Sequence, residues 1–140
     1  MKINIQIYND SSYKYLPKKK LIEVVENVFR HEKKGTDILL NIIYINDEKI
    51  WEINRKYLKH NRTTDVITFS LDEEEKIIEG EIYISVDTAK KQSDEYKVTF
   101  NNEIMRLAVH GALHLAGYDD DTDKNRILMH NLENKYLEMI

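Results

Sequence analysis

The sequence predicts an α+β domain in which a small mixed β-sheet of about four strands packs with about five helices. Short segments that alternate between polar and apolar residues, or that are rich in β-branched residues, are interleaved with longer segments whose apolar residues recur at helical spacing. No repeat, low-complexity stretch or linker interrupts the 140 residues, which contain one proline and four glycines. We therefore expect residues 1–140 to form one domain with one sizeable core.

Four segments have the character of strands: 2–8, 38–45, 64–71 and 81–86. The first alternates with a period of two, and the second is a β-branched run typical of a central strand. An acidic turn over residues 72–75, ending near Gly80, is expected to join the last two.

Five helices are expected: Pro17 to Gly35, Asp47 to Leu58, Asp87 to about Tyr96, Ile104 to Ala116 and about Thr122 to Met139. Proline suits the first position of a helix and glycine follows its end. Asp47 and Asp87 are candidate N-caps, because an aspartate side chain accepts hydrogen bonds from the N–H groups at a helix start.

The composition limits the classes of protein. With no cysteine, the chain has no disulfides and no thiolate ligands, so a zinc site would use nitrogen and oxygen ligands. The net charge of −4 argues against a protein that coats nucleic acid by bulk charge, although a local basic patch remains compatible with it. The N-terminus lacks the pattern of a signal peptide, and no segment has the ~20 apolar residues of a membrane span. We expect a cytoplasmic protein without a membrane partner.

The helix expected over residues 104–116 is apolar nearly all round, which is typical of a buried helix. Arg106, His110 and His114 are its polar residues, and together with Glu103 directly before it they form one narrow stripe at about 100° per residue. Such a stripe is typical of a functional site. Two core histidines bonded to backbone are the alternative.

His110 and His114 are four residues apart, so they lie on one helix face at the spacing of a metal-binding pair. Gly117 can end the helix, which brings Asp120 back toward the imidazoles. Three protein ligands and an open position are typical of a catalytic rather than a structural zinc site. Asp119 or Asp121 could replace Asp120 as the third ligand.

Two other metal chemistries fit less well. The aspartates of residues 119–123 lack the spacing and the closing glutamate of a calcium loop. Metallopeptidases with two histidines at this spacing carry a glutamate directly after the first, as general base. Here that residue is Gly111, which cannot accept a proton.

A basic cluster precedes the third expected strand. Arg55, Lys56, Lys59 and Arg62 lie around His60 and could contact phosphates. A solvated helix end explains the same residues equally well.

The histidine motif and several segments before it resemble the YbeY family of metal-dependent endoribonucleases. The family pattern His-Gly-x-Leu-His-Leu-x-Gly-Tyr-Asp-His is similar to residues 110–120 at every fixed position except the last, which is Asp120 here. Further similar segments are Ile53-Asn54 with Tyr57, residues 64–69, and residues 80–82 with Ser85. The resemblance extends from about residue 40 to the C-terminus.

The resemblance implies a single-strand-specific endoribonuclease that acts in 3′-end maturation of small-subunit ribosomal RNA and in ribosome quality control. It implies single-stranded RNA and the ribosome as partners, one zinc ion per chain, a cytoplasmic location and a metal at the mouth of a cleft.

The chain departs from the family at two positions. Asp120 replaces a histidine, but a carboxylate is also a zinc ligand and favours oxygen-preferring metals such as manganese. Leu58 stands where the family usually carries an arginine, so the phosphate-binding residues have no positional match.

As a mechanism we expect the metal to activate water while nearby cations neutralise the phosphate. Arg106 is a candidate catalytic cation on the histidine stripe, or it pairs with Glu103 or a strand carboxylate and supports the helix. The competing class is a non-catalytic, metal-stabilised RNA-binding protein of the ribosome.

Overall fold

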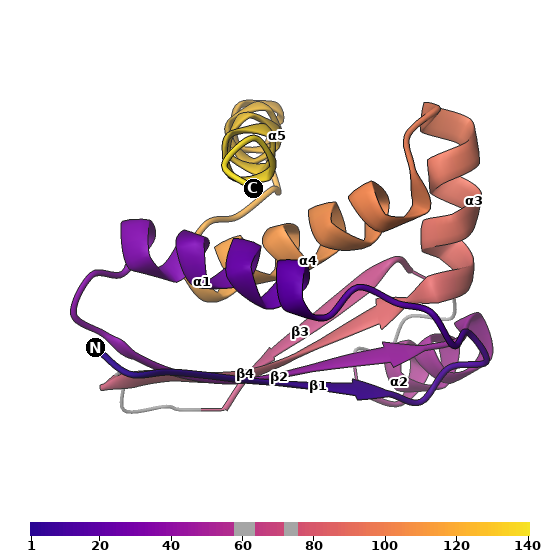
Figure 1. The fold of residues 1–140 in the computed structure, drawn as a ribbon, viewed down its shortest axis with the longest axis horizontal. Helices are drawn as coiled ribbons and strands as arrows, with labels where there is room; N and C mark the ends of the chain where they lie inside the picture. The colour runs from indigo at the N-terminus through magenta and orange to yellow at the C-terminus, as the bar shows by residue number, and fades with distance from the viewer. Residues whose placement is uncertain (58–63, 72–75) are drawn as a thin grey trace.

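The computed structural model describes residues 1–57, 64–71 and 76–140. It confirms the predicted α+β class (Figure 1). Within these residues the elements are β1 (Ile3–Asn9), α1 (Lys19–Glu32), β2 (Asp37–Ile45), α2 (Asp47–Tyr57), β3 (Val66–Ser70), β4 (Ile77–Ser85), α3 (Val86–Tyr96), α4 (Phe100–Leu115) and α5 (Asp123–Leu137).

The strands form one mixed sheet in the order β1-β2-β4-β3. Strands β1, β2 and β4 are parallel, and β3 is antiparallel to β4 at one edge. Parallel neighbours need a crossover, and α1 supplies it between β1 and β2. Strand β2 is central, as the β-branched run predicts.

Helices cover the sheet on both faces (Figure 1). The main core lies between one face of the sheet and α1 and α4, where alternate residues of β2 and β4 such as Leu40, Ile42 and Ile82 are fully buried. A smaller hydrophobic cluster, which includes Ile45 and Ile50, lies between α2 and the opposite face of the sheet. Helix α5 lies outside α1 and α4 as a third layer, so α4 is enclosed by the sheet and other helices, as its all-round apolar sequence predicts.

Two predicted element bounds were wrong for identifiable reasons. Helix α1 begins at Lys19 rather than at Pro17, because the carbonyl of Pro17 accepts a hydrogen bond from the Tyr44 hydroxyl at 2.6 Å and stays outside the helix. Strand β4 begins at Ile77 rather than at residue 81, and Gly80 lies inside it instead of closing a turn. A Cβ on Gly80 would lie 2.8 Å from the Phe69 carbonyl oxygen and 3.0 Å from Leu115, so close packing explains this glycine. The predicted acidic turn, residues 72–75, lies outside the described residues.

The candidate N-caps Asp47 and Asp87 serve each other's helix. The Asp87 carboxylate accepts a hydrogen bond from the backbone N–H of Asp47 at 2.8 Å, at the start of α2. The Asp47 carboxylate accepts from the hydroxyls of Ser85 and Thr88, at the start of α3. Ser85 itself is the N-cap of α3. The exchange ties α2 to α3 across the ends of β2 and β4.

No helix in the described part of the chain is long and apolar enough to cross a membrane.

Candidate metal centre

Helix α4 carries the two histidines, and it ends just before the turn that leads to Asp120, the predicted third ligand. Its N-cap Thr99 accepts a hydrogen bond from the N–H of Asn102 at 3.1 Å. At the other end Gly117 has φ +107°, and the Tyr118 N–H donates to the Leu113 carbonyl at 3.0 Å. This turn reverses the chain after α4, as glycine at the end of a helix predicts.

The reversal brings the carboxylate of Asp120 to the two imidazoles. Nε2 of His110 lies 3.0 Å from Nε2 of His114 and 3.3 Å from Oδ2 of Asp120, and Nε2 of His114 lies 3.6 Å from the same oxygen. The predicted ligand set is therefore gathered in one place. Arg126 holds the turn by donating to the Asp120 carbonyl oxygen at 3.3 Å.

These separations fit a tetrahedral metal ion. Ligand bonds of ~2.0–2.1 Å at tetrahedral angles place neighbouring ligand atoms about 3.3 Å apart, and the three separations lie on either side of that value. The side chains of His110, His114 and Asp120 are 22%, 25% and 42% exposed, so the fourth direction is open to solvent. The donor set of two nitrogens and one oxygen fits zinc, and also fits manganese.

A buried carboxylate orients His110 from behind. Nδ1 of His110 lies 2.7 Å from Oε2 of Glu133, whose side chain is 9% exposed. Donation from Nδ1 leaves the lone pair of Nε2 directed at the metal position, which is the usual arrangement of a metal-binding histidine. Burial disfavours the charged imidazolium, but the hydrogen bond to Glu133 and the charges of Glu133, Asp120 and Asp65 outweigh it and raise the pKa of His110.

Arg106 completes this network from one turn earlier on α4. It donates to Oε1 of Glu133 at 3.2 Å and to Oδ1 of Asn134 at 2.8 Å. Arg106 is therefore paired, with partners on α5 rather than with Glu103 or a strand residue, and its catalytic role stays a prediction. The chain Arg106–Glu133–His110 connects α5 to the metal ligands.

Gly111 lies on the face of α4 that packs on the sheet, away from the candidate metal site. A Cβ there would lie 2.9 Å from Cγ2 of Ile82 and 3.0 Å from Cγ2 of Thr68, so this position packs on the sheet. A glutamate in its place would have no room, which argues against the peptidase alternative beyond the absence of the base.

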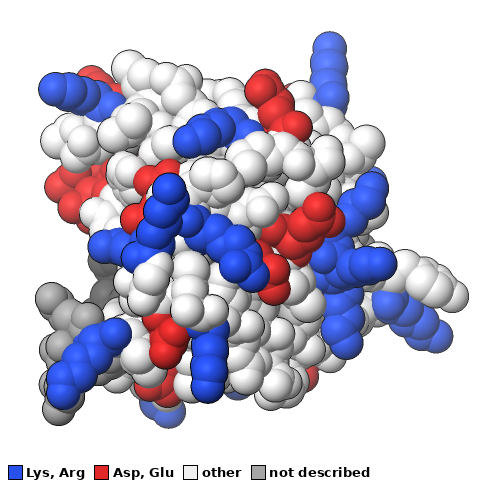
Figure 2. Space-filling model, turned by 60° about the vertical axis from the view of Figure 1, so that its left-hand side comes forward, with Lys and Arg blue, Asp and Glu red and all other residues white. Residues whose placement is uncertain are grey.

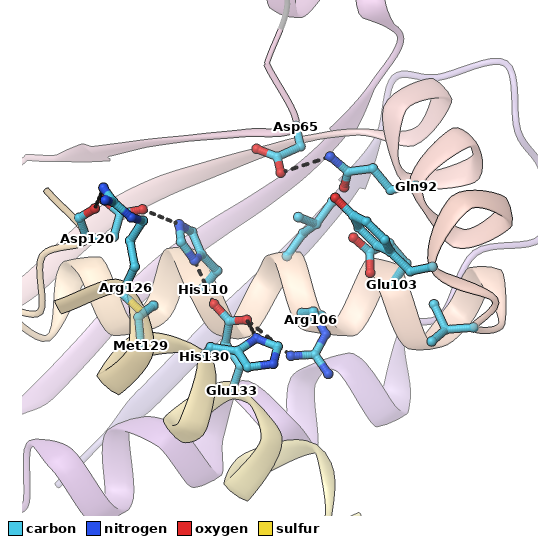
Figure 3. A pocket seen from close by; sticks show the side chains of 13 residues that line it. Asp65, Gln92, Glu103, Arg106, His110, Asp120, Arg126, Met129, His130 and Glu133 are labelled. Carbon is cyan, nitrogen blue, oxygen red and sulfur yellow. Dashed lines mark hydrogen bonds and ion pairs between the residues drawn. The ribbon is translucent and has the colours of Figure 1, made fainter. Parts of the chain in front are cut away.

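A cavity of about 530 Å³ opens beside His110 and Asp120 (Figure 3). It lies among α3, α4, α5 and the residue preceding β3. Its polar lining comprises Asp65, Gln92, Glu103, Arg106, Arg126, His130 and Glu133. Metal ligands at the edge of a cavity of this size form a typical small-molecule or substrate site.

A sequence model of the family described as "Endoribonuclease YbeY" matches residues 6–140. The chain belongs to the YbeY family of endoribonucleases. An Endoribonuclease YbeY of Chlorobium phaeobacteroides strain BS1 is 38% identical over 138 residues, covering 99% of this chain and 98% of the relative. The Endoribonuclease YbeY of Flavobacterium psychrophilum is 36% identical, covering 98% and 91%. A Thermotoga maritima protein solved in solution superposes with a TM-score of 0.62 at 31% identity, covering 96% and 87%.

Of the predicted RNA-binding residues, the structure describes Arg55 alone, and it lies away from the candidate metal ligands. Arg55 lies on α2, on the opposite side of the sheet from α4, with its guanidinium 4.6 Å from the ring centroid of Trp51. Lys59 and Arg62 lie outside the described residues, as does Leu58. Asp65, near the start of the next described segment, lines the cavity.

Sequence reasoning missed Glu133 and Asp65. A signal for Glu133 was present, because Met129, Glu133 and Tyr136 are the buried residues of α5 at helical spacing. An acidic residue within an apolar stripe indicates a buried carboxylate that needs a partner. Asp65 carried no comparable signal beyond its place in a YbeY-like segment.

Proposed function

We propose that the protein is a zinc-dependent endoribonuclease that hydrolyses phosphodiester bonds in single-stranded RNA. The observation that supports this most directly is the triangle of His110, His114 and Asp120, with ligand-atom separations suited to one tetrahedral ion. Family membership supplies the class of reaction, since the YbeY relatives bear the name endoribonuclease.

A divalent metal at such a site supplies a nucleophile near neutral pH, by lowering the pKa of water, and polarises the phosphoryl group. The protein's own residues hold that centre in place. Glu133 keeps the Nδ1 proton of His110, so that Nε2 stays available as a ligand. Arg106 acts through Glu133, because its guanidinium is bonded to Glu133 and Asn134.

The surface does not favour binding by bulk charge. Figure 2 shows acidic side chains interspersed among the lysines and arginines on the face it displays, and the net charge of the chain is −4. Recognition of RNA then depends on the metal and on local contacts. Arg55, Lys59 and Arg62 remain the proposed phosphate contacts.

The biological setting follows from the family resemblance. We place the protein in the cytoplasm, acting with the ribosome on the 3′ end of small-subunit ribosomal RNA. The two processes proposed are maturation of that end and ribosome quality control.

The test compares the purified protein, made without a histidine tag, with His114→Ala and with His31→Ala as matched control. His31 lies on α1 outside the cavity. We expect about one zinc per chain, and cleavage of a single-stranded oligoribonucleotide but not of its duplex. Both should be lost in His114→Ala and after chelation, and both kept in the control.

Full metal-dependent cleavage by His114→Ala would refute the site. Metal binding without cleavage by the wild type would instead favour the non-catalytic RNA-binding class.

A further inference from the structure

The cavity beside the metal ligands extends along α4 toward a second polar residue, Glu103. Glu103 and His110 are seven residues apart on one helix, which separates their backbones by about 10.5 Å. Both line the same cavity of about 530 Å³ (Figure 3). A nucleotide whose phosphate is at the metal ligands can therefore reach Glu103 with its base.

Glu103 is a buried acid with an unused acceptor. The residue is 2% exposed, and its Oε1 has no hydrogen-bond partner among the described residues. Arg106, three residues along the same helix, donates to Glu133 and Asn134 instead. A buried acceptor without a donor is costly to a fold, so its retention is explained by a ligand that supplies the donor.

The other lining residues favour a base over a second phosphate. The carboxylates of Asp65, Glu103, Asp120 and Glu133 outnumber the two arginines of the cavity, which disfavours an anion there. Apolar and aromatic side chains provide flat contact surface: Tyr96, Val98, Leu107 and Met129. A neutral ring with N–H donors suits such a lining.

We propose that this cavity binds the base of the nucleotide next to the scissile phosphate, and that Oε1 of Glu103 accepts a hydrogen bond from the exocyclic amino group of that base. The inference rests on the proposed cleavage of RNA. Adenine, cytosine and guanine carry such an amino group, and uracil does not. A site built around a hydrogen bond discriminates strongly against a ligand that lacks the donor, so uracil is disfavoured.

Glutamine is a close substitute at this position. Burial raises the pKa of Glu103, and the nearby carboxylates of Asp65 and Glu133 add to this against the opposing charge of Arg106. A glutamine side chain of the same size keeps an oxygen acceptor at Oε1, whereas leucine has no acceptor. Glu103→Gln should keep the preference for an amino group, whereas Glu103→Leu should lose it.

The first measurement is binding of cytidine and uridine monophosphates, as 5′ and 3′ isomers, to the zinc-loaded protein. We expect the wild type and Glu103→Gln to bind one cytidine isomer about tenfold tighter than its uridine counterpart. Glu103→Leu should bind both equally, and Glu23→Gln, an exposed control on α1, should behave as wild type.

The second measurement is cleavage of oligoribonucleotides that differ only in the base on either side of one cleavage site. At one of the two positions that flank the cleavage site, we expect kcat/KM to be about tenfold higher with cytosine than with uracil. This preference should vanish in Glu103→Leu. Thermal unfolding separates this from a structural role, because Glu103→Leu removes an unpaired buried acceptor and should unfold at the same or a higher temperature than wild type.

Equal binding of cytidine and uridine nucleotides by the wild type would overturn the proposal. So would an undiminished preference in Glu103→Leu. A preference that depends on Glu103 in a protein that cleaves no RNA would uphold the base pocket and refute the nuclease function instead.

Discussion

Replacing Glu133 by glutamine should weaken zinc binding without touching a ligand. The glutamine keeps the size of the side chain but loses the charge that lies 2.7 Å from Nδ1 of His110. Loss of such a partner of a metal-binding histidine typically costs 10–100-fold in affinity, or about 1.4–2.7 kcal/mol.

The loss should depend on pH in a defined direction. Glu133 is the main reason that the pKa of His110 is raised despite burial, so the wild type takes up a competing proton at a higher pH than the variant does. Below that pKa, the proton competes with zinc for His110 and weakens zinc binding by the wild type. Above it, this competition disappears. The ratio of the two affinities should therefore be larger at pH 8 than at pH 6.

The assay is competition for zinc against a chromophoric chelator at both pH values and fixed ionic strength. Asn134→Ala is the matched control, because it removes the other partner of Arg106 and leaves the contact between Glu133 and His110 intact. Its affinity should stay within about threefold of wild type, well short of the loss expected on removing a carboxylate partner. A loss below threefold in Glu133→Gln at pH 8, or an equal loss in the control, would refute this account of His110.

Three further outcomes are expected. Gly111→Ala should lower the free energy of unfolding in urea by about 1 kcal/mol, since overpacking against the sheet costs about 1–3 kcal/mol and the gain in helix propensity returns about 1 kcal/mol; a more stable variant would contradict the close packing. Asp120→His should bind zinc more tightly and manganese more weakly than wild type in a metal competition, because nitrogen replaces oxygen; an unchanged preference would remove Asp120 from the ligand set. The pKa of Glu32 is lowered, because hydrogen bonds from Tyr118 and Tyr136 outweigh burial, so its contribution to stability is present above the ordinary value of 4.5 and is lost as pH falls through the lowered one. The stability advantage of wild type over Glu32→Gln in thermal unfolding should accordingly shrink between pH 6 and pH 3, and a constant advantage would exclude this linkage.

Much of the fold was predictable because local pattern and burial agree. Period-two alternation in β1, the β-branched run of β2 and the all-round apolar α4 each indicate both the element and its place in the core. Bounds were wrong where a distant contact decides them. The carbonyl of Pro17 is bonded to Tyr44 outside α1, and residue 80 is a glycine inside β4 because α4 and β3 approach it closely.

The metal ligands were predictable from sequence because His110, His114 and Asp120 lie within eleven residues. A helix turn and a glycine reversal determine their geometry locally. Their supporting residues come from elements far along the chain. Nothing local shows that Glu133 meets His110, or that Asp65 reaches the cavity beside it, because these contacts depend on how α5 and β3 pack on α4.

The hydroxyls of Tyr118 and Tyr136 share one acceptor, the carboxylate of Glu32 at the end of α1, with the Tyr118 contact at 2.5 Å. The contacts span 86 and 104 residues of sequence. The loop that carries Asp120 is thus fastened to the first helix, while all three metal ligands lie in the last third of the chain. During synthesis the early segments can fold first, and the carboxylate of Glu133 that orients His110 reaches the site only when α5 docks. A nascent chain that lacks α5 therefore holds the three candidate ligands without the carboxylate that supports His110.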